Sequence, residues 1–173
     1  MKFYFVDNEY IDYLQQFDVQ VKNYKGKHYV KKRTYIGIIL EINDCKYLAP
    51  LSSPKPTDYH EDGTVRKSIV PLIRMIGDRE DDFLGTIRLS AMIPIFDDEV
   101  SIEYDLDNEK DVLYKKLLLK QLEFININKE LILRNAQKLY KQKTKGTNIN
   151  YLKSTVNFTL LEEKAKEFKK GRD

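Results

Sequence analysis

Apolar and polar residues follow two different periodicities along this chain, one in roughly the first hundred residues and another in the rest. Short apolar, β-branched runs separated by polar turns dominate the first part, a pattern typical of β-strands. Asn43 and Asp44 form a tight-turn signal between two of these runs, which predicts a hairpin there. The expected strands cover residues 2–6, 35–42, 45–51, 67–75, 83–89, 92–95 and 100–104.

Helical spacing of apolar residues replaces this pattern in the last third of the chain. One segment covers residues 109–125, and a second runs through residues 131–140. Thr159 and Glu162 have the spacing of a capping box, in which a hydroxyl and a carboxylate each accept a hydrogen bond from a free backbone N–H. A last helix is therefore expected from about residue 160 to residue 168.

The order of strands first and helices second favours the α+β class. We expect a strongly twisted, mostly antiparallel sheet that forms a partial barrel, with helices added mainly at the C-terminal side. One short helix, capped by Asp7, is expected near the start of the chain. The sequence shows no repeat and no long linker, so residues 1–173 are interpreted as a single domain.

Composition narrows the class of protein further. Hydrophobic residues make up 42% of the 173 residues, and 33% are charged, which is typical of a folded domain with a solvated surface. No apolar run approaches the roughly 20 residues that span a membrane. The chain reaches Asp7 too soon for a signal peptide, so a cytoplasmic location is expected. The single Cys45 excludes an internal disulfide framework and is expected to be a buried small hydrophobe.

Charge is distributed unevenly, although the formal net charge is only +3. Residues 22–33 and 138–153 are basic and contain no acid, whereas residues 97–111 contain eight acids and one lysine. Clustered cations neutralise phosphates, and the tyrosines interleaved with them suit unstacked bases of single-stranded RNA. The lysines expected to bind RNA are Lys22, Lys25, Lys27, Lys31, Lys32, Lys141, Lys143 and Lys145.

Several familiar sites are missing from the sequence. It has no glycine-rich nucleotide loop of either common type. Its two histidines, His28 and His60, both lie in predicted loops, so a histidine-pair nuclease or a zinc site has weak support. The acids of residues 78–82 are more typical of a solvated turn than of a Mg²⁺ site. We therefore expect no metal and no cofactor.

One short segment combines hydroxyls with a cation where a predicted strand ends. Ser52, Ser53, Pro54 and Lys55 follow each other there, and two hydroxyls beside an ammonium can grip a phosphate. An ordinary Ser/Pro turn with a surface lysine has the same composition. Residue chemistry by itself leaves both interpretations open.

Longer segments of the chain resemble the ToxN/AbiQ family of type III toxins. They come in the family's order and span nearly the whole chain, and the segments at residues 46–55 and 157–164 are the most specific. The matching segments are residues 1–4, 9–14, 35–38, 46–55, 91–95 and 157–164, among them Tyr-Leu-Ala-Pro-Leu-Ser-Ser-Pro-Lys and Phe-Thr-Leu-Leu-Glu-Glu-Lys.

The resemblance implies a fold similar to that of the MazF and Kid toxins. It also implies a sequence-specific endoribonuclease that needs no metal and leaves 2′,3′-cyclic phosphate and 5′-hydroxyl ends. Such a toxin processes the repeats of its own RNA antitoxin. The pseudoknotted product then blocks the active site within a closed assembly of alternating protein and RNA. In cells, the system acts in abortive infection by phage.

The family's active-site residues can be carried over position by position. The serine falls on Ser53, with Ser52 beside it, and the lysine falls on Lys55. Two tyrosines fall on Tyr10 and Tyr29, which the resemblance places near the phosphate. A basic residue falls on Arg33, where other members carry lysine. Arginine keeps the charge but cannot exchange a proton.

The general base of this reaction is left open by the residues. Lys55 is the first choice and His28 or His60 the alternative. Two other functions also fit parts of the sequence. One is a non-catalytic RNA-binding module, which would not need the Ser52–Lys55 loop. The other is a protein-binding factor that uses the acidic residues 97–111 as its contact surface.

Overall fold

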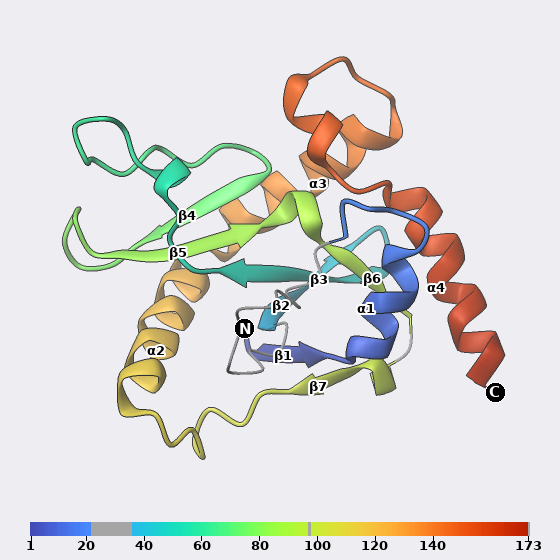
Figure 1. Cartoon of the computed structure of the whole chain (residues 1–173), viewed down its shortest axis with the longest axis horizontal. Helices are drawn as coiled ribbons and strands as arrows, with labels where there is room; N and C mark the ends of the chain where they lie inside the picture. The colour runs from blue at the N-terminus through green and yellow to red at the C-terminus, as the bar shows by residue number, and fades with distance from the viewer. Residues whose placement is uncertain (22–35, 97, 173) are drawn as a thin grey trace.

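The structure is a computed structural model that describes residues 1–21, 36–96 and 98–172. Its strands come first and most of its helices afterwards, as expected (Figure 1). The strands are β1 (Phe3–Val6), β2 (Ile36–Ile42), β3 (Cys45–Ser52), β4 (Leu72–Ile76), β5 (Phe83–Arg88), β6 (Ile93–Ile95) and β7 (Ser101–Glu103). The helices are α1 (Asn8–Gln15), α2 (Val112–Ile127), α3 (Lys129–Thr144) and α4 (Phe158–Arg172).

The strands of the described residues form one antiparallel sheet in the order β4-β5-β3-β2-β1-β7, and β6 also pairs with β3. Within those residues the sheet stays open, since β4 and β7 lie at its two ends. β3 is the central strand. Its first half pairs with β6, and its last two residues pair with β5. This confirms the expected α+β class and the antiparallel sheet.

The predicted hairpin joins β2 to β3. Ile42 pairs with Cys45, and the two residues between them have positive φ angles, 50° at Asn43 and 61° at Asp44. Asparagine and aspartate tolerate this left-handed conformation, which a two-residue turn needs in order to follow the twist of the strands.

Two elements begin three or more residues later than the sequence predicts. β4 begins at Leu72 rather than at residue 67, because residues 69–72 form a turn and Pro71 has no N–H to donate to a neighbouring strand. α2 begins at Val112, because the Asp111 side chain accepts hydrogen bonds from the N–H groups of the first turn.

The predicted capping box at the last helix is wrong. α4 begins at Phe158, and the Asn157 side chain accepts hydrogen bonds from the Leu160 N–H and the Thr159 hydroxyl. Thr159 therefore lies inside the first turn. Glu162 turns towards the sheet instead of back to the helix start, because two tyrosine hydroxyls offer it hydrogen bonds there.

α3 and α4 cover one face of the sheet around Tyr47 of β3. The Tyr47 ring is fully buried and packs edge-to-face on Tyr140 and Phe158, with centroids 6.0 and 5.8 Å away. The hydroxyls of Tyr47 and Tyr140 both donate to the Glu162 carboxylate. Burial first, and then the hydrogen bond to Glu162, raises the pKa of Tyr140 to about 12.

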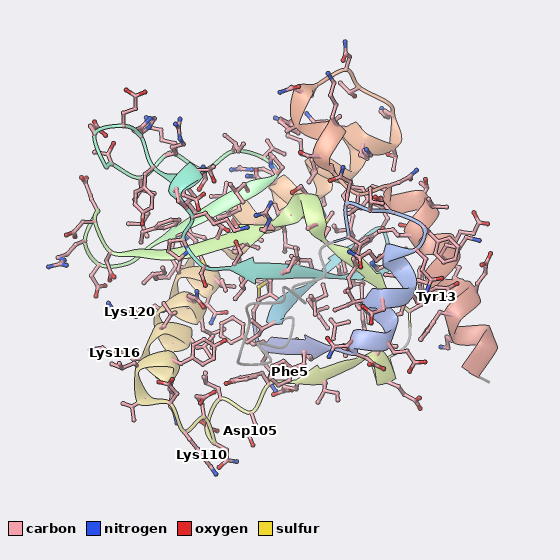
Figure 2. The ribbon with its side chains drawn as sticks, viewed as in Figure 1. Phe5, Tyr13, Asp105, Lys110, Lys116 and Lys120 are labelled. Carbon is pink, nitrogen blue, oxygen red and sulfur yellow. The ribbon has the colours of Figure 1, made fainter. Side chains whose placement is uncertain are left out.

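Cys45 is buried in this core, as predicted, and burial raises the pKa of its thiol to about 12. α1 also packs against α4, where the centroid of the Tyr13 ring lies 4.9 Å from that of Phe168. Figure 2 shows Tyr13 on α1, on the side that faces α4. In the parts of the chain that the structure describes, no helix is both long and apolar enough to cross a membrane.

Candidate active site at the end of β3

The Ser52–Lys55 loop begins where β3 pairs with β5. Ser52 is the last residue of β3 and lies directly opposite Thr86. The two hydroxyl oxygens are 2.7 Å apart, so one donates a hydrogen bond to the other. Thr86 is buried, whereas Ser52 is only half-buried. The buried Thr86 hydroxyl thus orients the Ser52 hydroxyl.

The backbones of β3 and β5 approach each other closely at this point. Gly85 has a φ of +111°, and a Cβ atom built there would lie 2.5 Å from the Ser52 carbonyl oxygen. A side chain would therefore push β3 away from β5 where the loop begins. Because Gly85 has no side chain, β3 and β5 can approach closely enough for Ser52 to contact Thr86.

The loop itself is exposed, but a buried ion pair anchors its far end. The side chains of Ser53 and Lys55 reach solvent, and a short 3₁₀ turn, Pro56–Asp58, follows. The Lys55 N–H donates a 3.0 Å hydrogen bond to Asp58 Oδ2, and Arg74 Nε donates one of 3.1 Å to Asp58 Oδ1. Asp58 is 4% exposed and Arg74 8%. The loop is thus tied to β4 as well as to β5.

Arg88 lies on the same face of β5 as Thr86, since the two are separated by one residue of a strand. Its Nε atom is buried and has no hydrogen-bond acceptor within the described residues. A buried guanidinium donor without an acceptor is unfavourable, and a phosphate oxygen brought close to Arg88 would offset this.

Four residues of this site have no local sequence signal: Asp58, Arg74, Thr86 and Arg88. Thr86 and Arg88 can be assigned to one strand face from their spacing, but their neighbours depend on which strands pair. Asp58 and Arg74 come together only because the chain between them turns back on itself. The two residues have no characteristic spacing in the sequence that would predict their contact.

Tyr10 lies in the core of the fold. Its ring is buried, and its hydroxyl donates a 2.6 Å hydrogen bond to the Pro94 carbonyl in the core. Pro94 is the register partner of Tyr47, and Ser52 lies five residues further along β3, a distance of about 17 Å at the usual rise per residue. The hydroxyl thus donates to a backbone carbonyl of β6, and the predicted role of Tyr10 at the phosphate remains a prediction.

The other predicted residues near the start of the chain fall outside the described residues. This holds for Tyr29, Arg33 and His28, and for the first group of lysines, Lys22, Lys25, Lys27, Lys31 and Lys32. Their predicted roles remain predictions. His60 is described and lies exposed two residues after the Pro56–Asp58 turn.

The C-terminal lysines differ from one another. Lys141, near the end of α3, and Lys145, just after it, are exposed. The half-buried Lys143 instead donates a 2.8 Å hydrogen bond from its ammonium to the Leu152 carbonyl. Two of the three predicted RNA-binding lysines are therefore available at the surface, and the third closes the loop after α3.

The acidic segments form local hydrogen bonds and ion pairs. Asp105, which is labelled in Figure 2, accepts hydrogen bonds from Asn108, and Asp111 caps α2. In the turn at residues 78–82, Asp82 pairs with Lys120 at 2.6 Å. Among the described residues, no three histidine, cysteine, aspartate or glutamate side chains are grouped so that they could hold a metal ion.

Comparison with known proteins shows that the chain belongs to the toxins of type III toxin–antitoxin systems. A family model described as "Toxin ToxN, type III toxin-antitoxin system" matches residues 2–166. The chain therefore belongs to this ToxN family, which confirms the resemblance seen in the sequence.

Relatives with known names agree with this assignment. An endoribonuclease ToxN from Pectobacterium atrosepticum is 39% identical over 171 residues, covering 98% of this chain and 95% of the relative. Since this relative is named as an RNA-cleaving enzyme, the expected enzyme class is confirmed.

Two solved structures share the fold over nearly the full length of both chains. One, described as "A processed non-coding RNA regulates a bacterial antiviral system", has a TM-score of 0.82 and 34% identity, covering 97% of this chain and 99% of the other. The other, described as showing selective toxin inhibition by a non-coding RNA pseudoknot, has a TM-score of 0.78 and 27% identity, covering 97% of both.

Proposed function

We propose that this protein is a cytoplasmic endoribonuclease toxin that cleaves single-stranded RNA at a specific sequence without a metal ion. The observation that carries the proposal is the Ser52–Lys55 loop, which presents hydroxyls and an ammonium at a strand end. The Ser52 hydroxyl is hydrogen-bonded to Thr86, and the Lys55 backbone N–H is hydrogen-bonded to Asp58. Membership of the ToxN family supports it independently.

In the proposed reaction the substrate supplies its own nucleophile. The ribose 2′-oxygen attacks the adjacent phosphorus, and the bond from phosphorus to the 5′-oxygen breaks. The 2′ proton goes to a general base, and the 5′-oxygen takes up a proton as it leaves. The products are a 2′,3′-cyclic phosphate and a 5′-hydroxyl, so neither water nor an oxidant enters this step.

The loop residues suit the charge that develops in this step. The Lys55 ammonium neutralises the extra negative charge of the pentacoordinate phosphorus. The hydroxyls of Ser52 and Ser53 hydrogen-bond the non-bridging oxygens and hold the reacting atoms in line. Arg88, on the adjacent strand face, adds a second cation. The general base is a histidine, or Lys55 in its neutral form, which becomes the ammonium when it takes the 2′ proton. Tyr29 and Arg33 complete the site.

Inhibition follows from the same chemistry. An RNA antitoxin presents phosphates to the lysines and lies across the loop, so that substrate cannot enter. The exposed Lys141 and Lys145 belong to the surface that this RNA contacts. The protein processes its antitoxin from a repeated transcript, assembles with it into a closed ring, and is released to act when phage infection disturbs that assembly.

The test uses purified wild-type and Ser53→Ala protein with a short, single-stranded, A-rich RNA in excess EDTA. We expect wild type to cut the RNA and to leave a cyclic phosphate at the new 3′ end, and Ser53→Ala to leave it intact. Cleavage that stops in EDTA would refute metal independence. Tight RNA binding without cleavage of any RNA would show the protein to be a non-catalytic RNA-binding module.

A further inference from the structure

The Asp58 carboxylate makes two contacts that point in different directions. Its Oδ2 atom accepts a hydrogen bond from the backbone N–H of Lys55 at 3.0 Å. Its Oδ1 atom accepts one from Arg74 Nε at 3.1 Å. One buried carboxylate therefore joins the backbone of the candidate active-site lysine to a strand of the sheet.

Arg74 is itself held from several sides. Its Nη1 atom donates a 2.7 Å hydrogen bond to the Lys67 carbonyl, and its backbone N–H donates to the Ser68 hydroxyl at 2.8 Å. Arg74 also lies directly opposite Thr86 in the pairing of β4 with β5. Thr86 in turn contacts the Ser52 hydroxyl. Both ends of the loop are thus attached to one pair of facing residues in the sheet.

An exposed loop that only binds RNA does not need this arrangement. Electrostatic attraction to phosphates tolerates a mobile lysine, because it depends on net charge and weakly on position. Stabilising the transition state depends on position, and a displacement of about 1 Å can lower a rate about 100-fold. The buried Asp58–Arg74 pair, which is hydrogen-bonded to the backbone of Lys55, therefore favours a role of this loop in catalysis over RNA binding alone.

We propose that Asp58 is a positioning residue for RNA cleavage, which sets the backbone of Lys55 so that its ammonium meets the reacting phosphate, and that Arg74 holds Asp58 in place. This inference rests on the proposed function. It adds residues that do not touch the substrate and act through Lys55.

The first variant is Asp58→Asn. An amide offers one oxygen acceptor instead of two and leaves the Arg74 charge buried without its counter-charge. We expect kcat for a short RNA to fall about 30- to 100-fold while KM changes less than about threefold, as expected for a residue that acts on position rather than on binding.

Loss of the buried ion pair also lowers stability, so a second variant separates the two effects. Asp58→Leu combined with Arg74→Met removes both charges, and apolar replacement of a buried ion pair is often neutral for stability. Its melting temperature should return towards that of wild type. Its kcat should be low, because leucine offers the Lys55 N–H no acceptor at all. Recovery of kcat together with stability would show that the pair is only structural.

Dependence on Lys55 is the sharpest readout. In a Lys55→Ala background, Asp58→Asn should lower the residual rate less than about threefold, since a residue that acts through Lys55 has nothing left to position. A full 30- to 100-fold further loss in that background would overturn the inference. Asp82→Asn, which breaks the partly exposed pair with Lys120, is the matched control and should leave kcat unchanged.

These outcomes distinguish failure of the inference from failure of the proposed function. Wild type that cuts no RNA, or Lys55→Ala that cuts as well as wild type, would refute the proposed site itself. Inactive Lys55→Ala together with fully active Asp58→Asn would refute only the positioning role.

Discussion

The loop at the end of β3 and the basic segment at residues 138–153 both present lysines, but they hold them differently. The backbone of Lys55 is hydrogen-bonded to a carboxylate that is itself buried and paired. Lys141 and Lys145 stand exposed at the end of a helix. A reacting phosphate requires a fixed position, whereas a long RNA requires only charge along its path. The difference supports the proposed chemistry at the first region and the proposed antitoxin binding at the second.

The largest effect is expected for Lys55→Ala. Loss of the ammonium removes the charge that stabilises the transition state, so cleavage of a short RNA should slow about 1,000-fold. The melting temperature should not change, because the side chain is exposed. Single-turnover kinetics and a thermal melt measure the two quantities. Lys116→Ala on the exposed surface of α2 is the control. An equal loss of rate there would show that the effect is not specific to the loop.

Gly85→Ala tests the foundation of the loop and ranks second. The new Cβ atom would lie 2.5 Å from the Ser52 carbonyl oxygen at a residue with a φ of +111°. We expect a loss of about 3 kcal/mol in the free energy of unfolding, together with slower cleavage. Gly63→Ala has a similar backbone, φ +83°, in open space, and should lose only about 1 kcal/mol. Urea titrations of both variants decide, and equal losses would contradict the close contact.

The double variant Lys141→Ala with Lys145→Ala tests the second region and should change binding rather than chemistry. Removing two exposed cations should weaken antitoxin binding and lower the slope of log affinity against log salt by about 1 to 2. Cleavage of a short RNA should stay within about twofold of wild type. Binding measured at several salt concentrations gives the slope, and an unchanged slope would remove these lysines from the RNA surface.

Lys143→Met is expected to have the smallest effect, and of the opposite kind. This ammonium donates to the Leu152 carbonyl, so its loss should lower the free energy of unfolding by about 1 kcal/mol. The salt slope should move less than in the double variant. A decrease in the salt slope of about 1 with an unchanged free energy of unfolding would show that Lys143 binds RNA as its exposed neighbours do.

Much of the fold could be predicted from the sequence because its signals are local. The hairpin follows from two adjacent residues, Asn43 and Asp44, that tolerate a left-handed turn. The last helix was also predictable, although its cap is Asn157 and not Thr159. Both residues are good caps, and only the path of the backbone chooses between them.

The support of the site could not be predicted in the same way. Ser52 and Thr86 are 34 residues apart and meet only through strand pairing. Asp58 and Arg74 form an ion pair across a reversal of the chain. Tyr10 was assigned to the site from the family resemblance, and it shares the buried face of α1 with Ile11 and Leu14. Helical periodicity alone predicts that position in the core.

The covering of Tyr47 has a consequence for how such a toxin is made. Tyr47 belongs to the central strand, but its ring and hydroxyl are covered by Phe158 and Glu162 of α4, which is translated after every strand of the sheet. A nascent chain on the ribosome cannot complete this core until α4 has emerged from the exit tunnel. A chain that ends before α4 would leave Tyr47 of the central strand uncovered, so we expect the core beneath the active loop to form only after α4 has been made.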